Sequence, residues 1–293
     1  MAADDFDSSK YAGEVILTLS PDASIATLTL NRPERLNTMS RTLNMGVMDA
    51  LDRVAGDDRV RVLIFTGSGR AFSAGGDLKD GGASQGFSDG GTMVVESAVR
   101  VLRMNMDSSR LLREMGKVTI CAINGACAGA ALSWACACDL RFASKNAKFA
   151  TAFISAGLSG DFGGTWTLPR IVGPAKAREL YLLNKKLSAE EALAIGLVSE
   201  VLESPAALMS RVGQVAQNLA SAAPIALVRI KQNLLASDSE LSFTDHLGLE
   251  AENHARSGYH LDALEAGASF VQKRPASFAG IGRQREPWEQ SKL

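Results

Sequence analysis

Two short stretches of small residues lie where a ligand could reach the backbone. In GRAFSAGGDL (69–78), Gly75-Gly76 follows an apolar run, VLIFTG, that predicts a strand. In INGACAGAALSWACACDL (123–140), Gly129-Ala130 precedes an almost wholly apolar run that predicts a buried helix. The first N–H groups of a helix have no partner within the helix, and the helix dipole is positive at that end. An anionic oxygen could therefore approach the backbone at both places.

Two backbone donors that converge on one point form an oxyanion hole, which stabilises a developing enolate. Losing one such donor costs roughly 3–4 kcal/mol. Glycine-rich turns after strands and tightly packed small-residue helices are also common for structural reasons alone, so the pair is more informative than either stretch. A dinucleotide site is a poorer interpretation, because Phe72 stands where the third glycine of the fingerprint would be.

A single acid, Asp161, lies in a third stretch, GLSGDFGGTW (157–166), among glycines and a phenylalanine. Desolvation in such a loop would raise the pKa of the carboxyl group and make it a better general base. The alternative is that Asp161 caps a short helix running from Thr165 to Leu168. The residues alone leave both interpretations open.

The elements around these stretches predict an α/β architecture. EVILTLS and IATLTLN, separated by PDAS, are typical of a hairpin, and a helical pattern runs from about Ser40 to Val54. VRVLIFTG, KVTICAIN (117–124) and DLRFAS (139–144) predict buried strands that alternate with helices, which favours parallel pairing. Residues 79–92 are rich in Gly, Ser and Asp and predict a surface loop, a candidate lid.

Strand patterns stop at about residue 203, and helical patterns follow. We therefore predict three parts: a disordered N-terminal tail (1–12), an α/β core (13–204) and a C-terminal helical region (205–293). No internal repeat is evident.

The bulk composition is that of a soluble globular protein, with 46% hydrophobic and 22% charged residues and a net charge of −1. The absence of a basic excess disfavours non-specific binding of nucleic acid. All four cysteines fall within one apolar stretch, which predicts buried thiols in a reducing compartment. Cys136 and Cys138 have no second pair nearby, and the three histidines lie far downstream, so we predict no metal site.

No apolar window is long enough to span a bilayer, and the acidic start is neither a signal peptide nor a transit peptide. The sequence ends in Ser291-Lys292-Leu293, the peroxisomal address tripeptide. We expect a soluble intracellular protein, cytoplasmic if bacterial and in the peroxisomal matrix if eukaryotic.

The three stretches, together with LNRPERLNTM (30–39) and LSAEEALAIGLVSEVL (187–202), resemble the crotonase superfamily, the enoyl-CoA hydratase/isomerase family. The resemblance covers roughly residues 13 to 280. It implies a crotonase-like spiral of ββα repeats, with C-terminal helices that support a homotrimer or a dimer of trimers. It also implies an acyl-CoA thioester substrate and no metal or redox cofactor, since CoA arrives as part of the substrate.

The resemblance also implies roles for individual residues. The thioester oxygen would sit between the N–H groups of Gly76 and Ala130. Arg32 and Arg35 would meet the CoA phosphates, Asp77 would anchor its own loop, and Lys273 would reach CoA, possibly across a subunit boundary. The full set expected to bind substrate or CoA is Arg32, Arg35, Leu36, Ala74, Asp77, Leu78, Gly129 and Lys273.

The sequence departs from the hydratases of that family at two positions. Their paired glutamates match Ser133 and Phe153, neither of which is an acid. Asp161 matches the position where the family's isomerases carry their single acid, and where 4-chlorobenzoyl-CoA dehalogenases carry an Asp nucleophile. The resemblance therefore favours double-bond isomerisation of an enoyl-CoA, with Asp161 as acid and base. The alternatives are an enoyl-CoA hydratase of fatty-acid β-oxidation and a non-catalytic acyl-CoA or RNA binder.

Overall fold

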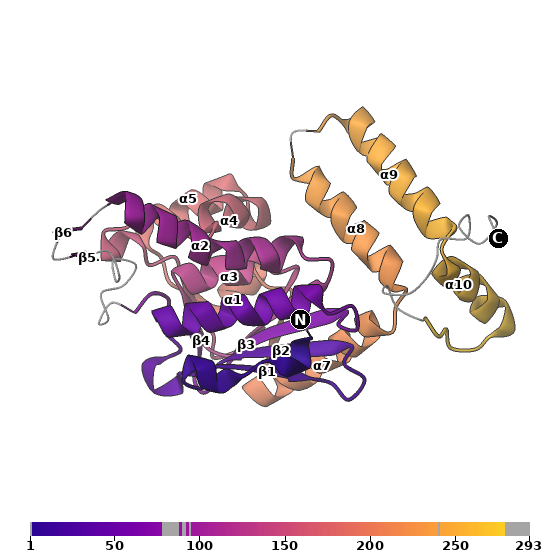
Figure 1. Cartoon of the computed structure of the whole chain (residues 1–293). Coiled ribbons are helices and arrows are strands. Elements are labelled where there is room, and N and C mark those ends of the chain that lie inside the picture. Colours follow the sequence, from indigo (N-terminus) through magenta and orange to yellow (C-terminus); the bar gives the residue numbers. More distant parts are fainter. Residues whose placement is uncertain (1, 78–87, 90–91, 94, 240, 279–293) are drawn as a thin grey trace.

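The computed structural model describes residues 2–77, 88–89, 92–93, 95–239 and 241–278 (Figure 1). Its strands are β1 Val15–Leu19, β2 Ile25–Leu30, β3 Val62–Gly67, β4 Ala71–Ser73, β5 Ser88–Asp89, β6 Thr92–Met93, β7 Val118–Ile123, β8 Ala126–Ala128, β9 Leu140–Ser144, β10 Lys148–Ala150, β11 Leu187–Ser188 and β12 Glu200–Leu202. Its α-helices are α1 Arg41–Gly56, α2 Val95–Glu114, α3 Ala130–Ala137, α4 Gly164–Val172, α5 Pro174–Leu183, α6 Ala189–Ala194, α7 Pro205–Ala220, α8 Pro224–Ser237, α9 Phe243–Gly258 and α10 Leu261–Gln272. Short 3-10 turns include Ala3–Asp5, Ser8–Tyr11, Pro33–Arg35 and Ile154–Ala156.

Two sheets are wound from alternating strands. The larger has the order β1-β2-β3-β7-β9-β12, and the smaller has the order β11-β10-β8-β4. Each of the pairs β3/β4, β7/β8 and β9/β10 contributes its first strand to the larger sheet and its second to the smaller one. The neighbours from β2 to β12 in the larger sheet pair in parallel, while β1 and β2 form an antiparallel hairpin. This winding confirms the predicted α/β spiral and the predicted hairpin.

The larger sheet is covered on both faces. In β3, Leu63 and Phe65 join the main core cluster, to which α1 and α3 contribute, while Val62 and Ile64 pack in a second cluster with α7. A strand covered on both sides needs apolar residues at every position, and all six residues of β3 are buried. The continuous apolar run in the sequence therefore reflects two helical layers rather than one.

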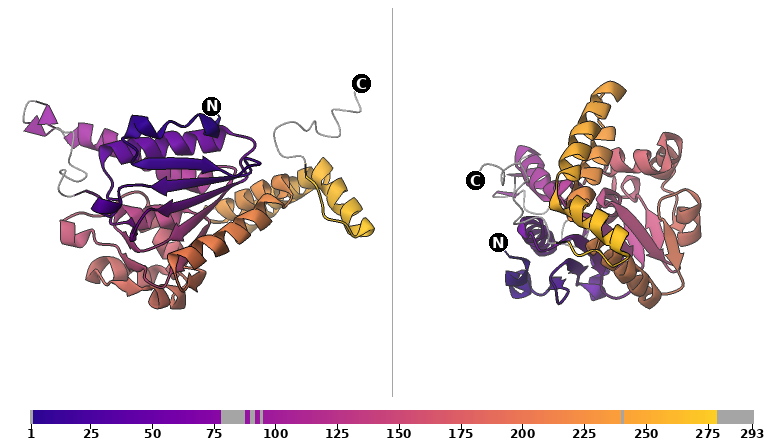
Figure 2. Two further views of the ribbon diagram at one scale, coloured as in Figure 1. Left: turned by 90° about the horizontal axis from the view of Figure 1, so that it is seen from below. Right: turned by 90° about the vertical axis from the view of Figure 1, so that its right-hand side faces the viewer.

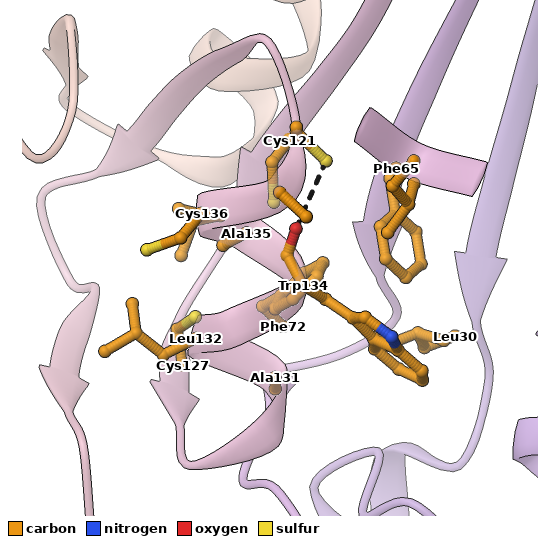
Figure 3. Close-up of a cluster of buried hydrophobic side chains, with 14 of the residues drawn as sticks. Leu30, Phe65, Phe72, Cys121, Cys127, Ala131, Leu132, Trp134, Ala135 and Cys136 are labelled. Carbon is orange, nitrogen blue, oxygen red and sulfur yellow. Dashed lines mark hydrogen bonds between the residues drawn. The ribbon is translucent and has the colours of Figure 1, made fainter. Parts of the chain in front are cut away.

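Helix α3 passes through the centre of the main cluster. All eight of its residues are buried, as its apolar sequence predicts. Trp134 packs against Phe65, and Figure 3 shows its indole ring pointing out of α3 into the cluster. The four cysteine thiols are buried and free. The prediction of buried thiols is confirmed.

The prediction that residues 1–12 are disordered is wrong for the part that the structure describes. Two 3-10 turns fold back on the core, and Ala3 is buried. The N–H group of Ala3 donates to Asp57 at 3.0 Å, and Asp4 pairs with Arg59 at 2.8 Å. The polar composition of this segment predicts disorder because it gives no sign of these contacts, whose partners lie more than fifty residues further along the chain.

The helices after α7 form an arm that projects from the core (Figures 1 and 2). Helix α7 itself belongs to the core, because Leu208, Val212 and Ala216 are buried against the sheet. The boundary between core and arm therefore lies at Pro224, not at residue 205. Helix α8 is held to the core by Lys231, whose ammonium donates to Asp139 and to the Lys117 carbonyl at 2.8 Å each.

None of the helices among the described residues is long and apolar enough to cross a bilayer.

Candidate active site

The turn after β4 presents the N–H group of Gly76 away from its neighbouring strand. The N–H group of Met39 donates to the Gly75 carbonyl at 2.9 Å. The described residues contain no cis peptide bond, and in a trans peptide the carbonyl and the following N–H point in opposite directions. The N–H group of Gly76 therefore points away from Met39, and Gly76 is solvent-exposed. The turn leaves this donor open to a ligand.

The N–H group of Ala130 points out of the start of α3 for the same reason. The carbonyl of Gly129 accepts hydrogen bonds from Leu132 at 3.0 Å and from Ser133 at 3.2 Å, and so points along the helix. The N–H of the same peptide must point the other way, outward from the helix N-terminus. Gly129 has φ +57° and ψ −131°, a conformation that favours glycine.

These two turns are in contact with each other. A Cβ built on Gly75, where φ is +89°, would lie 2.7 Å from the Ala128 carbonyl oxygen and 3.6 Å from the Cα of Gly129. Only glycine allows such a close approach at this backbone conformation. The chain thus brings the two segments that carry Gly76 and Ala130 together, although more than fifty residues separate them.

Asp161 lies in a tight loop that precedes α4. Gly160, Phe162 and Gly163 all have positive φ values, of 116°, 50° and 78°. The helix begins at Gly164, its N-cap is Gly163, and no side chain caps it. The capping interpretation of Asp161 is therefore wrong; only its backbone carbonyl bonds the helix start, accepting from the Gly164 N–H at 3.2 Å. The side chain is left for another role.

The carboxyl group of Asp161 is largely shielded from water. Its Oδ1 atom is buried and finds no hydrogen-bond partner within the described part of the chain. Burial raises the pKa of Asp161 to about 6. Desolvation disfavours the carboxylate, because an ion loses its hydration and nothing nearby replaces it. An acid of this kind can accept and return a proton near neutral pH.

The Asp161 loop packs directly on α3. The ring of Phe162 meets the indole of Trp134 edge to face, with centroids 5.5 Å apart at 82°. A Cβ at Gly164 would lie within 3 Å of Ser133 Oγ. Since Ser133 and Ala130 are three residues apart on one helix, they lie on the same face of α3. The acid-bearing loop and one candidate oxyanion donor therefore share one short helix.

The two positions that match the hydratase glutamates carry no acid and meet a common neighbour. Ser133 is buried and Phe153 is buried, and both lie close to Tyr181 of α5. The rings of Phe153 and Tyr181 stack with centroids 6.1 Å apart and an interplanar angle of 11°. Tyr181 lies in the helical segment RELYLL, and no sequence motif around it predicts that it belongs to a site.

The residues expected to bind CoA fall into two groups. Asp77 is buried and pairs with Arg32 and with Arg35, each at 3.2 Å, and accepts from Thr38 Oγ1 at 3.0 Å. Arg32 also pairs with Glu14 at 3.0 Å. Asp77 therefore anchors its turn to the 32–38 segment, and Arg32 acts as part of this frame, whereas the side chain of Arg35 is 35% exposed.

The remaining CoA candidates are more scattered. The N–H group of Ala74 donates to the Leu36 carbonyl at 3.0 Å, so these two residues are neighbours beside the Gly75 turn. Lys273 is exposed and ends α10 on the arm. Leu78 and most of the predicted loop at 79–92 lie outside the described residues. Of that loop, the structure describes Ser88–Asp89 and Thr92, which belong to the antiparallel pair of β5 and β6. Residues 291–293 also lie outside the described residues.

Within the described part of the chain, no group of three or more His, Cys, Asp and Glu residues could hold a metal ion.

Comparison with known proteins places this chain in a family. The enoyl-CoA hydratase/isomerase family model matches residues 20–281. The chain is 36% identical to a 1,2-epoxyphenylacetyl-CoA isomerase from Escherichia coli, covering 88% of this chain and 96% of that protein. It is 31% identical to a crotonyl-CoA hydratase from Syntrophomonas wolfei, over 89% of this chain and 97% of that protein. The crystal structure of an enoyl-CoA hydratase from Bacillus anthracis superposes with a TM-score of 0.82 at 27% identity, covering 92% of this chain and 100% of that one. The chain belongs to the enoyl-CoA hydratase/isomerase family and is an enzyme of the crotonase type.

Proposed function

We propose that this enzyme moves a double bond in an enoyl-CoA, with Asp161 as the single acid and base. The observation that carries the proposal is the buried, unpartnered Oδ1 of Asp161 on the loop that packs against α3. A carboxylate held there is a competent base near neutral pH, since burial raises its pKa to about 6. Hydration, another reaction of this family, would need an acid to activate water, and this chain has none at Ser133 or Phe153.

The reaction moves one proton from one acyl carbon to another. Asp161 removes a proton from the carbon next to the thioester carbonyl of a 3-enoyl-CoA. The electron pair delocalises into a dienolate whose oxygen accepts hydrogen bonds from the N–H groups of Gly76 and Ala130. The protonated Asp161 then returns the proton two carbons further along the chain, and the conjugated 2-enoyl-CoA forms. No atom is gained or lost, and the carboxylate is regenerated.

Similarity to named relatives does not choose between isomerisation and hydration, and it does not choose the substrate. The relative from Escherichia coli is named for isomerisation of 1,2-epoxyphenylacetyl-CoA, and the relative from Syntrophomonas wolfei is named for hydration of crotonyl-CoA. An epoxide or a ring-bearing acyl group would use the same oxyanion site. The acyl group is therefore left to experiment.

Incubation with a 3-enoyl-CoA tests the proposal by following the absorbance of the conjugated 2-enoyl-CoA product. We expect turnover by the natural protein and a loss of 10²- to 10⁴-fold in Asp161→Asn. Turnover retained in that variant would refute Asp161 as the base. Rapid water addition to crotonyl-CoA without double-bond migration would favour the hydratase. Tight thioester binding without any turnover would favour a binding protein.

CoA recognition is the second part of the proposal. Arg35, Leu36 and Ala74 lie beside the Gly75 turn, and we assign them, with Leu78 and Gly129, to the pantetheine and nucleotide end of the substrate. Arg32 and Asp77 would act there indirectly, by holding this turn in place. Lys273 lies on the arm, and it would serve a neighbouring subunit in an assembled oligomer.

The arm supports an assembly of several copies. Its helices carry large apolar side chains in water, among them Phe243, Phe270 and Val271, which are 77%, 86% and 79% exposed. Apolar surface of this kind marks an interaction site. We propose a homotrimer or a dimer of trimers, to be tested by light scattering on the eluting protein. Whether Ser291-Lys292-Leu293 directs import into peroxisomes is tested separately, by fusing the tripeptide to a fluorescent protein.

A further inference from the structure

Tyr181 runs beneath the loop that carries Asp161. Its ring stacks on Phe153 on one side. A Cβ at Gly160 would lie 3.7 Å from Tyr181 Cε1, so the residue before Asp161 rests against the ring. A Cβ at Gly164 would lie 2.6 Å from the Tyr181 hydroxyl oxygen, so the far end of the loop rests against the other end of the side chain. One side chain thus supports both ends of the Asp161 loop.

The hydroxyl end of Tyr181 meets Ser133 at the same point. Ser133 Oγ also lies within 3 Å of a Cβ built on Gly164. Within the described residues Ser133 Oγ makes no hydrogen bond of regular geometry, but it lies close enough to the Tyr181 hydroxyl to lower the pKa of the phenol slightly against the larger effect of burial. The two hydroxyl groups occupy the space next to Gly164, where a Cβ would otherwise lie, and no carboxylate is present there. The ring of Tyr181 extends from this point to Phe153, on which it stacks.

Tyr181 is not itself suited to exchange protons. Burial first, and then the charges of Cys136 and Asp161, raise the pKa of its phenol above the ordinary value. Those two groups, from α3 and from the loop before α4, are the titratable neighbours that act on it, and it remains a neutral phenol throughout the working pH range. For Asp161, burial is the cause of the raised pKa. The contribution of Tyr181 is therefore its volume and its position.

We propose that Tyr181 is a positioning residue, whose ring is wedged between Phe153 and the Gly160–Gly164 loop and keeps water away from the Asp161 carboxyl group. The inference rests on the proposed isomerisation, because it explains why the conjugated product is released rather than hydrated. Hydration would add the oxygen of water to the third acyl carbon and a proton to the second. A carboxylate with a water molecule beside it could catalyse that addition, whereas a carboxylate in a dry pocket can only shuttle a proton.

Three substitutions separate the ring from the hydroxyl. Tyr181→Phe keeps the ring, so kcat should stay within about threefold of the natural enzyme. Tyr181→Ala opens the space under the loop, so kcat should fall at least tenfold, KM should change little, and the pH midpoint of kcat should move from about 6 toward the ordinary value for Asp of about 3.9. A 3-hydroxyacyl-CoA should appear among the products. Tyr181→Leu keeps more apolar volume and should shift all three readouts the same way by less, which covers the case in which the alanine variant does not fold.

Tyr11→Ala is the matched control. Tyr11 is also half-buried and stacks on a phenylalanine, Phe6, with centroids 5.7 Å apart, in the N-terminal 3-10 turns. Its loss should lower stability and leave the pH midpoint and the product ratio unchanged. A pH midpoint and product ratio in Tyr181→Ala that match those of the control would overturn the proposal. So would equal damage in Tyr181→Phe and Tyr181→Ala, since that would assign the effect to the hydroxyl.

A direct titration separates this inference from the proposed function. The carboxyl carbon of Asp161 can be followed by NMR of ¹³C-labelled protein in the absence of substrate, with Asp161→Asn to assign its signal. The wedge predicts a midpoint near pH 6 in the natural protein and a lower one in Tyr181→Ala. This result would support the wedge even if the natural protein failed to isomerise 3-enoyl-CoA, and equal midpoints would refute it even if isomerisation were confirmed.

Discussion

Replacing Asp161 with asparagine should lower turnover by 10²- to 10⁴-fold and, at the same time, make the protein more stable at high pH. Asparagine has nearly the same shape as aspartate but cannot ionise or accept the proton. The native carboxylate is held where Oδ1 has no hydrogen-bond partner in the described structure and burial disfavours its charge. The charge therefore destabilises the folded protein, as is common for an ionisable group that serves catalysis.

The size of that cost follows from the pKa. Burial raises the pKa of Asp161 to about 6 in the folded chain, from an ordinary value of 3.8. About two units at about 1.4 kcal/mol each give an upper estimate of about 3 kcal/mol. Because the folded pKa is the higher one, the folded state holds the proton more tightly. The penalty is fully present above pH 6, shrinks as pH falls from about 6 to 4, and vanishes once both states are protonated.

Urea unfolding of both proteins over a pH series measures this difference. At pH 8 the asparagine variant should have a higher midpoint, by about 1 M urea, if the slope is about 3 kcal/mol per M for a chain of this size. At pH 4 only about 0.6 kcal/mol of the penalty remains, so the two midpoints should differ by about 0.2 M urea or less. Protein concentration must be equal in all samples, because any association of subunits would also stabilise the folded state. Equal midpoints at pH 8, or a variant less stable there, would show that Asp161 is not desolvated and would refute the reasoning.

Substitutions at Gly75, Gly164 and Asp77 test the frame of the site. Gly75→Ala places a Cβ against a backbone oxygen at φ +89°, so it should cost about 1–3 kcal/mol and lower kcat more than it weakens thioester binding; a kcat equal to that of the natural enzyme would argue against this turn as an oxyanion donor. Gly164→Ala should be destabilising, and adding Ser133→Ala should restore part of the loss, with a coupling of about 0.5–3 kcal/mol in thermal melts; strict additivity would contradict the contact. Asp77→Asn should cost about 2–3 kcal/mol, because Arg32 loses a buried carboxylate partner, and an unchanged urea midpoint would contradict that.

The local patterns of the sequence predicted most of the secondary structure. The apolar run of β3, the hairpin of β1 and β2 and the helix that begins after Ser40 all have signals within a few residues. Ser40 caps α1 by accepting from the Leu43 N–H, a contact three residues long. These elements could be read from the chain because the periodicity of burial is itself local.

Contacts between distant segments were not predictable in the same way. Residues 2–12 look disordered by composition, yet Ala3 and Asp4 bond Asp57 and Arg59. Helix α7 looks like the first helix of the arm, yet it completes the core. In each case the partner lies far along the chain, and no window of residues contains both.

The sequence by itself determined the strand and helix order and the glycines at the two turns. It also determined that this chain has an acid at Asp161 and none at Ser133 and Phe153, the two positions that match the glutamates of the family's hydratases. Only the tertiary structure decided that the Gly75 and Gly129 turns touch and that Asp161 loses its water. The residue type determines that Asp161 can bind and release a proton. The pKa of its carboxyl group depends on how much water the surrounding elements exclude. Those elements are brought together by folding alone.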